Sequence, residues 1–402
     1  MYQTNDEFVI HNPTGKKRLG LALLLGMLAI MGPLNIDMYL PSFPGITADL
    51  DTSPALVQVT LTACLLGLAF GQVFIGPLSD AEGRKKPLIL STSLFVVASL
   101  LCMFAPNIYV LIAARFLQGF TASAGVVLSR AVVRDIFSGR ELTKFFSLLM
   151  VINAVAPMAA PMSGGAILLL PFANWQTIFL FLAILGIVIV VIVALNLKET
   201  LPPEKRIKST GAASIRTMIS LINDRSFTVY AVIVGFVHGG SFAYVSGTPF
   251  IYQEIYGVSP QTFSILFGIN GIAIIIGSFI IGRLGGVIHE KHLLKTALII
   301  AVTATFILLI MTVIEGPLAA IVTLIFIYMT TMGMTVTSTF TLGMSEQGHR
   351  AGSASAVLGM LPLLLGAIFS PLAGVNEASA IPMGVILFTT ASIGLIAFFK
   401  MR

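Results

Sequence analysis

Residues 174–197 read NWQTIFLFLAILGIVIVVIVALNL, a run without a single charged side chain. An apolar run of about 20 residues is long enough to cross the hydrocarbon core of a bilayer as a helix. The residues that follow, from Lys198 to Arg225, are polar and include Pro202 and Pro203. We therefore predict a membrane-spanning helix that ends at a polar connecting segment.

Similar apolar runs recur along the whole chain of 402 residues, which is 56% apolar and only 10% charged, with a mean hydropathy of +0.98. A soluble domain has about 25% charged residues. Because backbone groups in lipid must be satisfied within their own segment, each run is expected to be a helix. We predict twelve spans, near residues 19–42, 55–78, 87–105, 108–130, 146–169, 174–197, 226–247, 262–282, 294–313, 317–343, 352–373 and 382–399.

The charges predict the orientation of these spans. If the N-terminus lies in the cytoplasm, all 23 Lys and Arg residues except Arg115 fall in or beside cytoplasmic segments. The loops on the other side carry acids instead: Asp49, Asp51, Glu254, Glu315 and Glu377. This is the positive-inside pattern. We expect both termini in the cytoplasm, and the net charge of +6 reflects topology rather than binding to nucleic acid.

The two halves of the chain repeat each other in two places. The Gly76-Pro77-Leu78 end of the second span matches Gly282-Arg283-Leu284 at the end of the eighth, and Ala160–Gly164 in the fifth resembles Ser370–Gly374 in the eleventh. Many transporters consist of two such repeats with the substrate site between them. We predict an N-terminal six-helix bundle at 1–197, a cytoplasmic linker at 198–225 and a C-terminal bundle at 226–402.

The loop after the second span carries a recognisable motif. Gly76-Pro77-Leu78-Ser79-Asp80-Ala81-Glu82-Gly83-Arg84-Lys85-Lys86 resembles the G-x-L-a-D-r-x-G-r-k signature of the major facilitator superfamily, with Ala81 in place of the usual arginine. The resemblance implies the fold of that family. It also implies a conformational role for Gly76, Asp80, Gly83 and Arg84.

Three further segments resemble motifs of proton-coupled exporters. Leu111–Gly119 is similar to the fourth-span motif of proton-coupled members, and Ala160–Gly165, with Pro161, Gly164 and Gly165, is similar to the antiporter motif. Asp37–Pro41 resembles the D-M-Y-L-P segment of the bicyclomycin/chloramphenicol-resistance group. The resemblance implies a drug:proton antiporter in the bacterial cytoplasmic (inner) membrane.

Asp37 and Arg115 also stand out without any family. Each is a charged residue within a span, and a charge at the centre of a membrane helix costs roughly 2.5–3.5 kcal/mol on insertion scales. The rise of a helix places both roughly 10–12 Å below the outer surface, so we expect them to share one polar cavity. They could form a static ion pair that locks the bundle. Alternatively, Asp37 carries protons and Arg115 tunes it.

A cavity for drugs is expected to be apolar and aromatic with a few polar anchors. Each anchor in a span could instead form a hydrogen bond between helices, and His238 could be a second proton carrier or a structural residue. The candidate substrate-binding residues are Asn35, Tyr39, Gln58, Gln118, Asn153, His238, Tyr244, Asn270 and Phe340.

The sequence favours a transporter over an enzyme. It has no G-x-x-x-x-G-K-[ST] phosphate loop and no H-E-x-x-H metal motif. We expect proton-coupled export of small, largely apolar, drug-like compounds, with protons as the coupling ion and no other cofactor or metal. An exporter of one specific metabolite is the alternative, and a receptor or intramembrane enzyme is less favoured. Gly67 and Gly71 form a G-x-x-x-G signal that we expect inside the bundle, so a monomer is predicted.

Overall fold

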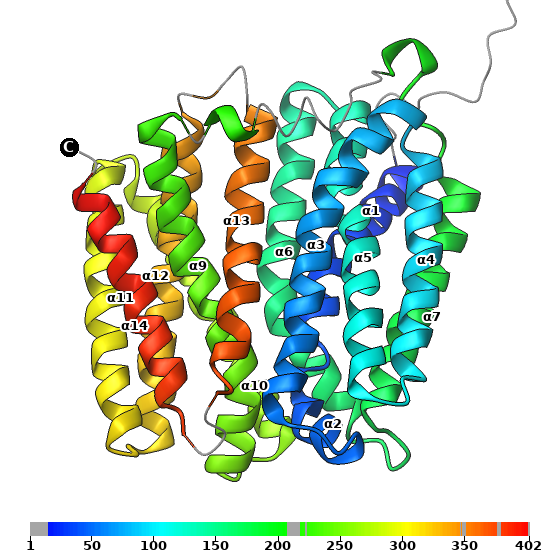
Figure 1. Ribbon diagram of the computed structural model, residues 1–402. Helices are drawn as coiled ribbons and strands as arrows, with labels where there is room; N and C mark the ends of the chain where they lie inside the picture. The colour runs from blue at the N-terminus through cyan, green and yellow to red at the C-terminus, as the bar shows by residue number, and fades with distance from the viewer. Residues whose placement is uncertain are drawn as a thin grey trace, which may run out of the picture.

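The computed structural model describes residues 15–206, 218–221, 223–345, 347, 351–375 and 379–400. In this part of the chain, 12 helices are long and apolar enough to cross a membrane. They stand side by side, with the short helix α2 at one end of the molecule (Figure 1). The predicted all-α membrane fold with twelve spans is therefore confirmed.

The first half contains six of these spans. Asparagine or serine side chains mark where several of them begin: Ser53, Asn107 and Asn174 each accept a hydrogen bond from a backbone N–H three residues later. The elements are α1 (Gly15–Asp37), η1 (Leu40–Ser42), α2 (Phe43–Asp49), α3 (Pro54–Glu82), α4 (Lys85–Met103), α5 (Ile108–Ile136), α6 (Gly139–Ile167) and α7 (Trp175–Asn196).

The second half repeats this arrangement after the short helix η2 (Pro203–Lys205). Asp224 and Ser259 cap the beginnings of its first two spans in the same way. The elements are α9 (Arg225–Phe250), η3 (Ile251–Ile255), α10 (Pro260–Leu284), α11 (Glu290–Val313), α12 (Leu318–Met344), α13 (Ala351–Leu372) and α14 (Ile381–Phe399).

Each half is a bundle in which the second and fourth spans cross closely. In the first half, Gly67 and Gly71 of α3 lie against the backbone of α5, so the G-x-x-x-G signal packs inside the bundle. In the second half, Gly277 of α10 and Gly333 of α12 face each other's helix backbone in the same manner. The same device in both halves reflects the internal repeat, because only glycine lets two helix backbones approach this closely.

The two bundles meet along two helix pairs. Helix α3 packs against α13, and α6 packs against α10. The first half lies on the right of Figure 1 and the second half on the left, with α13, α6 and α3 between them. These are the second, fifth, eighth and eleventh spans, so the contacts are related by the repeat. The predicted arrangement of two pseudo-symmetric six-helix bundles is thus confirmed.

The two ends of the molecule differ in charge. We call them the α2 end and the linker end, after the elements that lie there. The α2 end holds α2 and the turn η3, and the linker end holds the junction of α3 with α4 and the segment after α7. At the linker end the helices are longer than predicted: α3 extends to Glu82 rather than 78, α5 to Ile136 rather than 130, and α6 begins at Gly139 rather than 146. Hydropathy detects only the apolar part of a helix, whereas these ends continue as charged turns.

The predicted boundaries of the linker, 198–225, stay a prediction. Helix α7 ends at Asn196 and α9 begins at Arg225, in agreement with a polar connection between them. Residues 207–217 and 222 of this connection lie outside the described residues.

Candidate transport site

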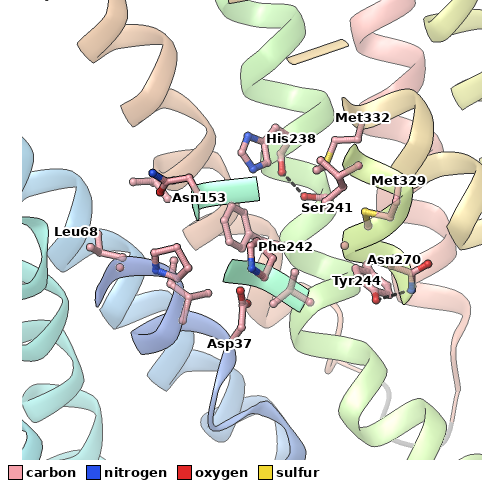
Figure 2. Close-up of a pocket in the computed structure, with 18 of the residues that line it drawn as sticks. Asp37, Leu68, Asn153, His238, Ser241, Phe242, Tyr244, Asn270, Met329 and Met332 are labelled. Carbon is pink, nitrogen blue, oxygen red and sulfur yellow. Dashed lines mark hydrogen bonds between the residues drawn. The ribbon is translucent and has the colours of Figure 1, made fainter. Parts of the chain in front are cut away.

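A cavity of about 300 Å³ lies between the two bundles. Residues of α1, α3, α5 and α6 line it from one side, and residues of α9, α10, α12 and α13 line it from the other. Figure 2 shows Asp37 and Leu68 across the cavity from His238, Phe242 and Tyr244. A cavity at the seam of two repeats is where an alternating-access transporter holds its substrate.

Asp37 is the last residue of α1, and its carboxylate faces this cavity. The side chain is 6% exposed. Among the described residues, no group donates a hydrogen bond to it and no cation lies within ion-pair distance. Proteins rarely bury a carboxylate without a partner, because removal from water penalises the charged form.

The backbone beyond Asp37 is held from behind by α6. Gly164 lies directly against the carbonyl oxygen of Met38, and any Cβ atom at position 164 would overlap that oxygen. Its neighbour Gly165 faces the other bundle, against Ser264 of α10. The predicted antiporter motif thus places one glycine on the turn after Asp37 and the next on the seam between the bundles. Pro161 lies within the same helix, one turn earlier.

Arg115 occupies a separate polar cluster within the first bundle. The guanidinium donates to Asn35 Oδ1 and Asn35 O, both at 2.7 Å, and to Gln118 Oε1 at 2.6 Å. It also lies 4.1 Å from the ring centroid of Tyr39 and 5.7 Å from that of Phe179. Carbonyl oxygens and aromatic faces together stabilise the buried cation. The Arg115 cluster is defined here as Asn35, Tyr39, Thr60, Cys64, Ser99, Arg115 and Gln118.

The expectation that Asp37 and Arg115 share one cavity is wrong. The two residues lie at similar depth, because Arg115 contacts Asn35, only two positions before Asp37. Consecutive residues of an α-helix are rotated by about 100°, so positions 35 and 37 point to nearly opposite sides of α1. Asn35 faces Arg115 and Asp37 faces the cavity. Between these described groups, the static ion pair is not formed.

The nine predicted substrate-binding residues lie in four different environments. Three of them, Asn35, Tyr39 and Gln118, belong to the Arg115 cluster rather than to the cavity. Gln58 lies on the seam, where its Nε2 donates to Ser246 O at 3.2 Å. Phe340 packs against the apolar side chains around Phe227 and Leu358.

The remaining four, Asn153, His238, Tyr244 and Asn270, line the cavity. Asn270 Nδ2 donates to the Tyr244 hydroxyl at 2.8 Å, and the Tyr244 ring stacks on Phe267 with centroids 5.1 Å apart. His238 stacks on the ring of Phe242 at 5.7 Å. Figure 2 shows His238, Phe242 and Tyr244 around the same cavity, together with Met329 and Met332. The cavity wall is therefore aromatic and apolar, with a few polar groups.

Sequence reasoning missed part of this lining. Phe242, Phe267, Met329 and Met332 are apolar residues within spans, and nothing in one sequence separates a cavity-facing apolar residue from a lipid-facing one. Arg130 was placed with the cytoplasmic charges, but it lies within α5 and lines the cavity. Hydropathy predicts that this helix ends at residue 130, whereas α5 continues to Ile136, so Arg130 lies nearly two turns before the helix end. This position inside a helix is the signal that could have identified it.

The cavity is closed at the α2 end. Hydrogen bonds between described residues of the two bundles lie in this half of the molecule, including Thr62 Oγ1 to Ala367 O at 3.1 Å and Gln253 Nε2 to Pro41 O at 3.2 Å. The rings of Phe43 and Phe250 also pack together, tilted by 47° with centroids 5.7 Å apart. At the other end, Gln72 and Arg130 line the cavity toward the linker side.

The linker end holds the predicted conformational motif. Arg84 donates to Asp80 at 2.6 Å and to Asp135 at 2.8 Å, joining α3, α4 and α5. Burial alone would lower the pKa of Arg84, but hydrogen bonds and charges from Asp135 and Asp80 outweigh it, so the pKa is raised. Gly76 lies in α3, where a Cβ would meet only Val127 at ordinary contact distance.

Glu199 binds the same junction from the segment after α7. Its carboxylate accepts hydrogen bonds from the backbone N–H groups of Arg84 at 2.8 Å and Lys85 at 3.2 Å, at the first turn of α4. A carboxylate is favourable at a helix N-terminus, where backbone N–H groups have no partner within the helix. Gly83, beside this carboxylate, has φ of 93°, a conformation that side chains other than glycine's rarely adopt. Asp80, Gly83 and Arg84 are thus brought together.

Comparisons with known proteins agree with this architecture. The family model described as Major Facilitator Superfamily matches residues 25–371. The chain is 69% identical over 97% of both chains to the "Uncharacterized MFS-type transporter YdgK" of Bacillus subtilis (strain 168). It is 30% identical to the "Bicyclomycin resistance protein homolog" of Haemophilus influenzae, covering 94% of each, and 30% identical to "Multidrug resistance protein MdtL" of Escherichia coli O157:H7, covering 91% of each.

A solved structure shows the same fold at low sequence identity. A D-xylose-proton symporter superposes with a TM-score of 0.75 and 15% sequence identity, covering 95% of this chain and 96% of the other. With the family match and these relatives, the resemblance to the major facilitator superfamily and to its bicyclomycin-resistance and multidrug-resistance proteins is confirmed. The family and the fold are those of transporters rather than enzymes.

Proposed function

The chain belongs to the major facilitator superfamily, and on this premise we propose that it exports small, largely apolar compounds in exchange for protons by alternating access. The observation that carries the proposal is Asp37: a carboxylate without a partner among the described residues, at the edge of an aromatic cavity between the bundles. The names of the relatives at 30% identity, a bicyclomycin resistance protein homolog and a multidrug resistance protein, support the substrate class.

The chemistry of exchange follows from this environment. In the empty cavity the low-dielectric surroundings favour the protonated, neutral form of Asp37. A compound that brings a positive charge or strong hydrogen-bond donors into the cavity favours the ionised form, so binding releases the proton. When the cavity faces the other side, protonation of Asp37 removes that attraction and releases the compound. One carboxylate thus binds either a proton or a substrate.

Arg115 takes a different part in this proposal from the one predicted. A guanidinium does not deprotonate in proteins, so Arg115 does not carry the proton. It binds both the side chain and the backbone carbonyl of Asn35, which fixes the end of α1 two residues before Asp37. We assign it the role of a positioning residue that keeps Asp37 turned toward the cavity.

The direction of transport rests on the charge distribution. The positive-inside pattern supports an orientation with the linker end and both termini on the cytoplasmic side. With the α2 end closed, the described state would load compounds from the cytoplasm, as an exporter requires. The substrate partners are drug-like small molecules, the bilayer is the solvent, and the functional unit is a monomer without a cofactor or bound nucleic acid.

One observation favours the alternative, an exporter of one specific metabolite. The cavity volume of about 300 Å³ is small for a multidrug site, since pockets for drug-sized ligands range from about 300 to 1,000 Å³. A panel of unrelated compounds separates the two: protection of a drug-sensitive strain against several of them supports multidrug export, and protection against a single one supports the alternative.

The proton-coupling test compares Asp37→Asn with Asp51→Asn. Asp51 lies in the loop at the α2 end with φ of 44°, which asparagine tolerates, and it is not among the cavity-lining residues. Purified protein in liposomes is given a pH gradient, and uptake of ethidium and of radiolabelled chloramphenicol is measured.

We expect Asp37→Asn to lose gradient-driven accumulation by at least about tenfold, because an amide cannot take up the proton. Exchange of compound across the membrane without a gradient should continue, and Asp51→Asn should behave as the wild type. Full gradient-driven accumulation by Asp37→Asn would show that another group carries the proton.

A further inference from the structure

Arg130 presents a cationic group that the exchange mechanism does not use. It lies on α5 one turn beyond Val126, and both residues line the cavity. In the described part of the chain its guanidinium has neither a hydrogen-bond partner nor an ion-pair partner. The carboxylates of Asp80 and Asp135, at the linker end of α3 and α5, both bind Arg84. An arginine without a partner on a cavity wall is available to an anionic group of a ligand.

The cavity therefore has opposite charges toward its two ends. Among its described lining residues, Asp37 and Arg130 are the ones with a full charge. Arg115 marks the depth of Asp37, and the fifteen residues from Arg115 to Arg130 rise by about 22 Å along α5. Side chains of a helix tilt toward its N-terminus. For α5 this is the α2 end, so the tilt directs the Arg130 side chain back along the helix toward the depth of Asp37.

The wall between these two charges suits an apolar body. Phe242 and Phe267 contribute ring faces, and Met329 and Met332 contribute flexible thioethers. Methionine adapts to ligands of different shape. The cavity therefore presents the Arg130 guanidinium, then an apolar wall, then the Asp37 carboxylate. A compound with an aromatic centre, an anionic group at one end and a cationic group at the other would match this order.

We propose that Arg130 is an anion subsite, and that the preferred substrates are extended zwitterions that place a carboxylate at Arg130 and an amine at Asp37. This inference rests on the proposed function and adds a charge at each end of the apolar body that its substrates present to the cavity wall. The planar guanidinium binds a carboxylate through two parallel hydrogen bonds. The amine takes the place of the proton on Asp37. With the zwitterion bound, both charges of the cavity are compensated.

The test measures binding rather than transport, so its outcome is independent of proton coupling. Norfloxacin carries a carboxylate and a distant amine and is fluorescent, and its methyl ester lacks the negative charge of the carboxylate. Affinities of both are measured on purified full-length wild type, Arg130→Gln, Arg130→Lys and Arg134→Gln. Arg134 is the matched control, because it is exposed one turn further along the same helix.

We expect the wild type to bind norfloxacin about tenfold more tightly than its ester, the range of a hydrogen bond to a charged group. Arg130→Gln should remove this preference by weakening norfloxacin alone. Arg130→Lys should retain part of it, and Arg134→Gln all of it. Equal weakening of both compounds by Arg130→Gln would assign Arg130 to the architecture and overturn the subsite.

Equal affinities of the two compounds for the wild type would overturn it as well, while gradient-driven export of chloramphenicol could still stand. Conversely, a norfloxacin preference that depends on Arg130, together with a failure of proton-driven export, would uphold the subsite and refute the exchange mechanism. Failure to bind either compound would refute the assigned substrate class.

Discussion

Thermal stability separates the roles of Asp37 and Arg115. Replacing Arg115 by methionine removes three hydrogen bonds. Among the described residues, Asn35 Oδ1 then loses its side-chain donor, Asn35 O loses the guanidinium, and Gln118 Oε1 keeps only the weak thiol donor of Cys102. Each such orphaned group costs about 1–3 kcal/mol. Relief from burying a guanidinium offsets part of the sum. We expect a net loss on the order of 3 kcal/mol, which for a chain of this size lowers the melting temperature by about 4 °C.

Asp37→Asn is the contrasting variant. Asparagine has nearly the shape of aspartate, and no hydrogen bond from a described residue is lost because the carboxylate accepts none. Asparagine is also neutral, like the protonated aspartate that the empty cavity favours, so the change adds no buried charge. We therefore expect the melting temperature of Asp37→Asn to equal or slightly exceed that of the wild type, although gradient-driven transport is lost.

A thiol-reactive fluorescent dye measures both melting curves. Cys64 and Cys102 are both free and buried, so the dye reacts only as the bundle opens. Both also lie at the Arg115 cluster, where Cys64 accepts from Asn35 Nδ2 at 3.2 Å and Cys102 donates to Gln118 Oε1 at 3.6 Å. An Arg115→Met protein that melts like the wild type, or an Asp37→Asn protein that melts several degrees lower, would refute the division of roles.

Two further predictions concern the packing around the site. Gly164→Ala should lower the free energy of unfolding by about 1–3 kcal/mol, because the added methyl group meets the Met38 backbone and cannot be accommodated by a side-chain shift. Gly20→Ala is the control, since its methyl group meets nothing within 4 Å, and equal melting temperatures of the two variants would contradict the close approach of Gly164 to Met38. Glu199→Ala should raise the rate of amide hydrogen exchange at least about tenfold at the backbone N–H groups that Glu199 binds in the first turn of α4 and just after α7. Glu204→Ala is the control and should leave these rates unchanged. Unchanged rates in both variants would mean that Glu199 does not hold this junction.

The sequence by itself determined the membrane fold and its repeat. Hydropathy is a local property, so each apolar run identified its own span, and residues 174–197 required no knowledge of their neighbours. The positions of Lys and Arg predict the orientation in the same local way. The motif around Asp80 and Arg84 was visible because charged residues are rare in this chain and form a fixed pattern.

Only the tertiary structure decided which side of each helix faces the cavity. Asn35 and Asp37 are equally polar and nearly adjacent, but α1 is packed so that one meets Arg115 and the other meets the cavity. In the sequence, Arg130 is one of the cytoplasmic charges that indicate orientation. In the structure it lies on the cavity wall, because α5 continues beyond it to Ile136. Rotation of a helix about its axis is set by close contacts with its neighbours, such as Gly164 against Met38. Those contacts join residues far apart in the chain, so no local pattern encodes them.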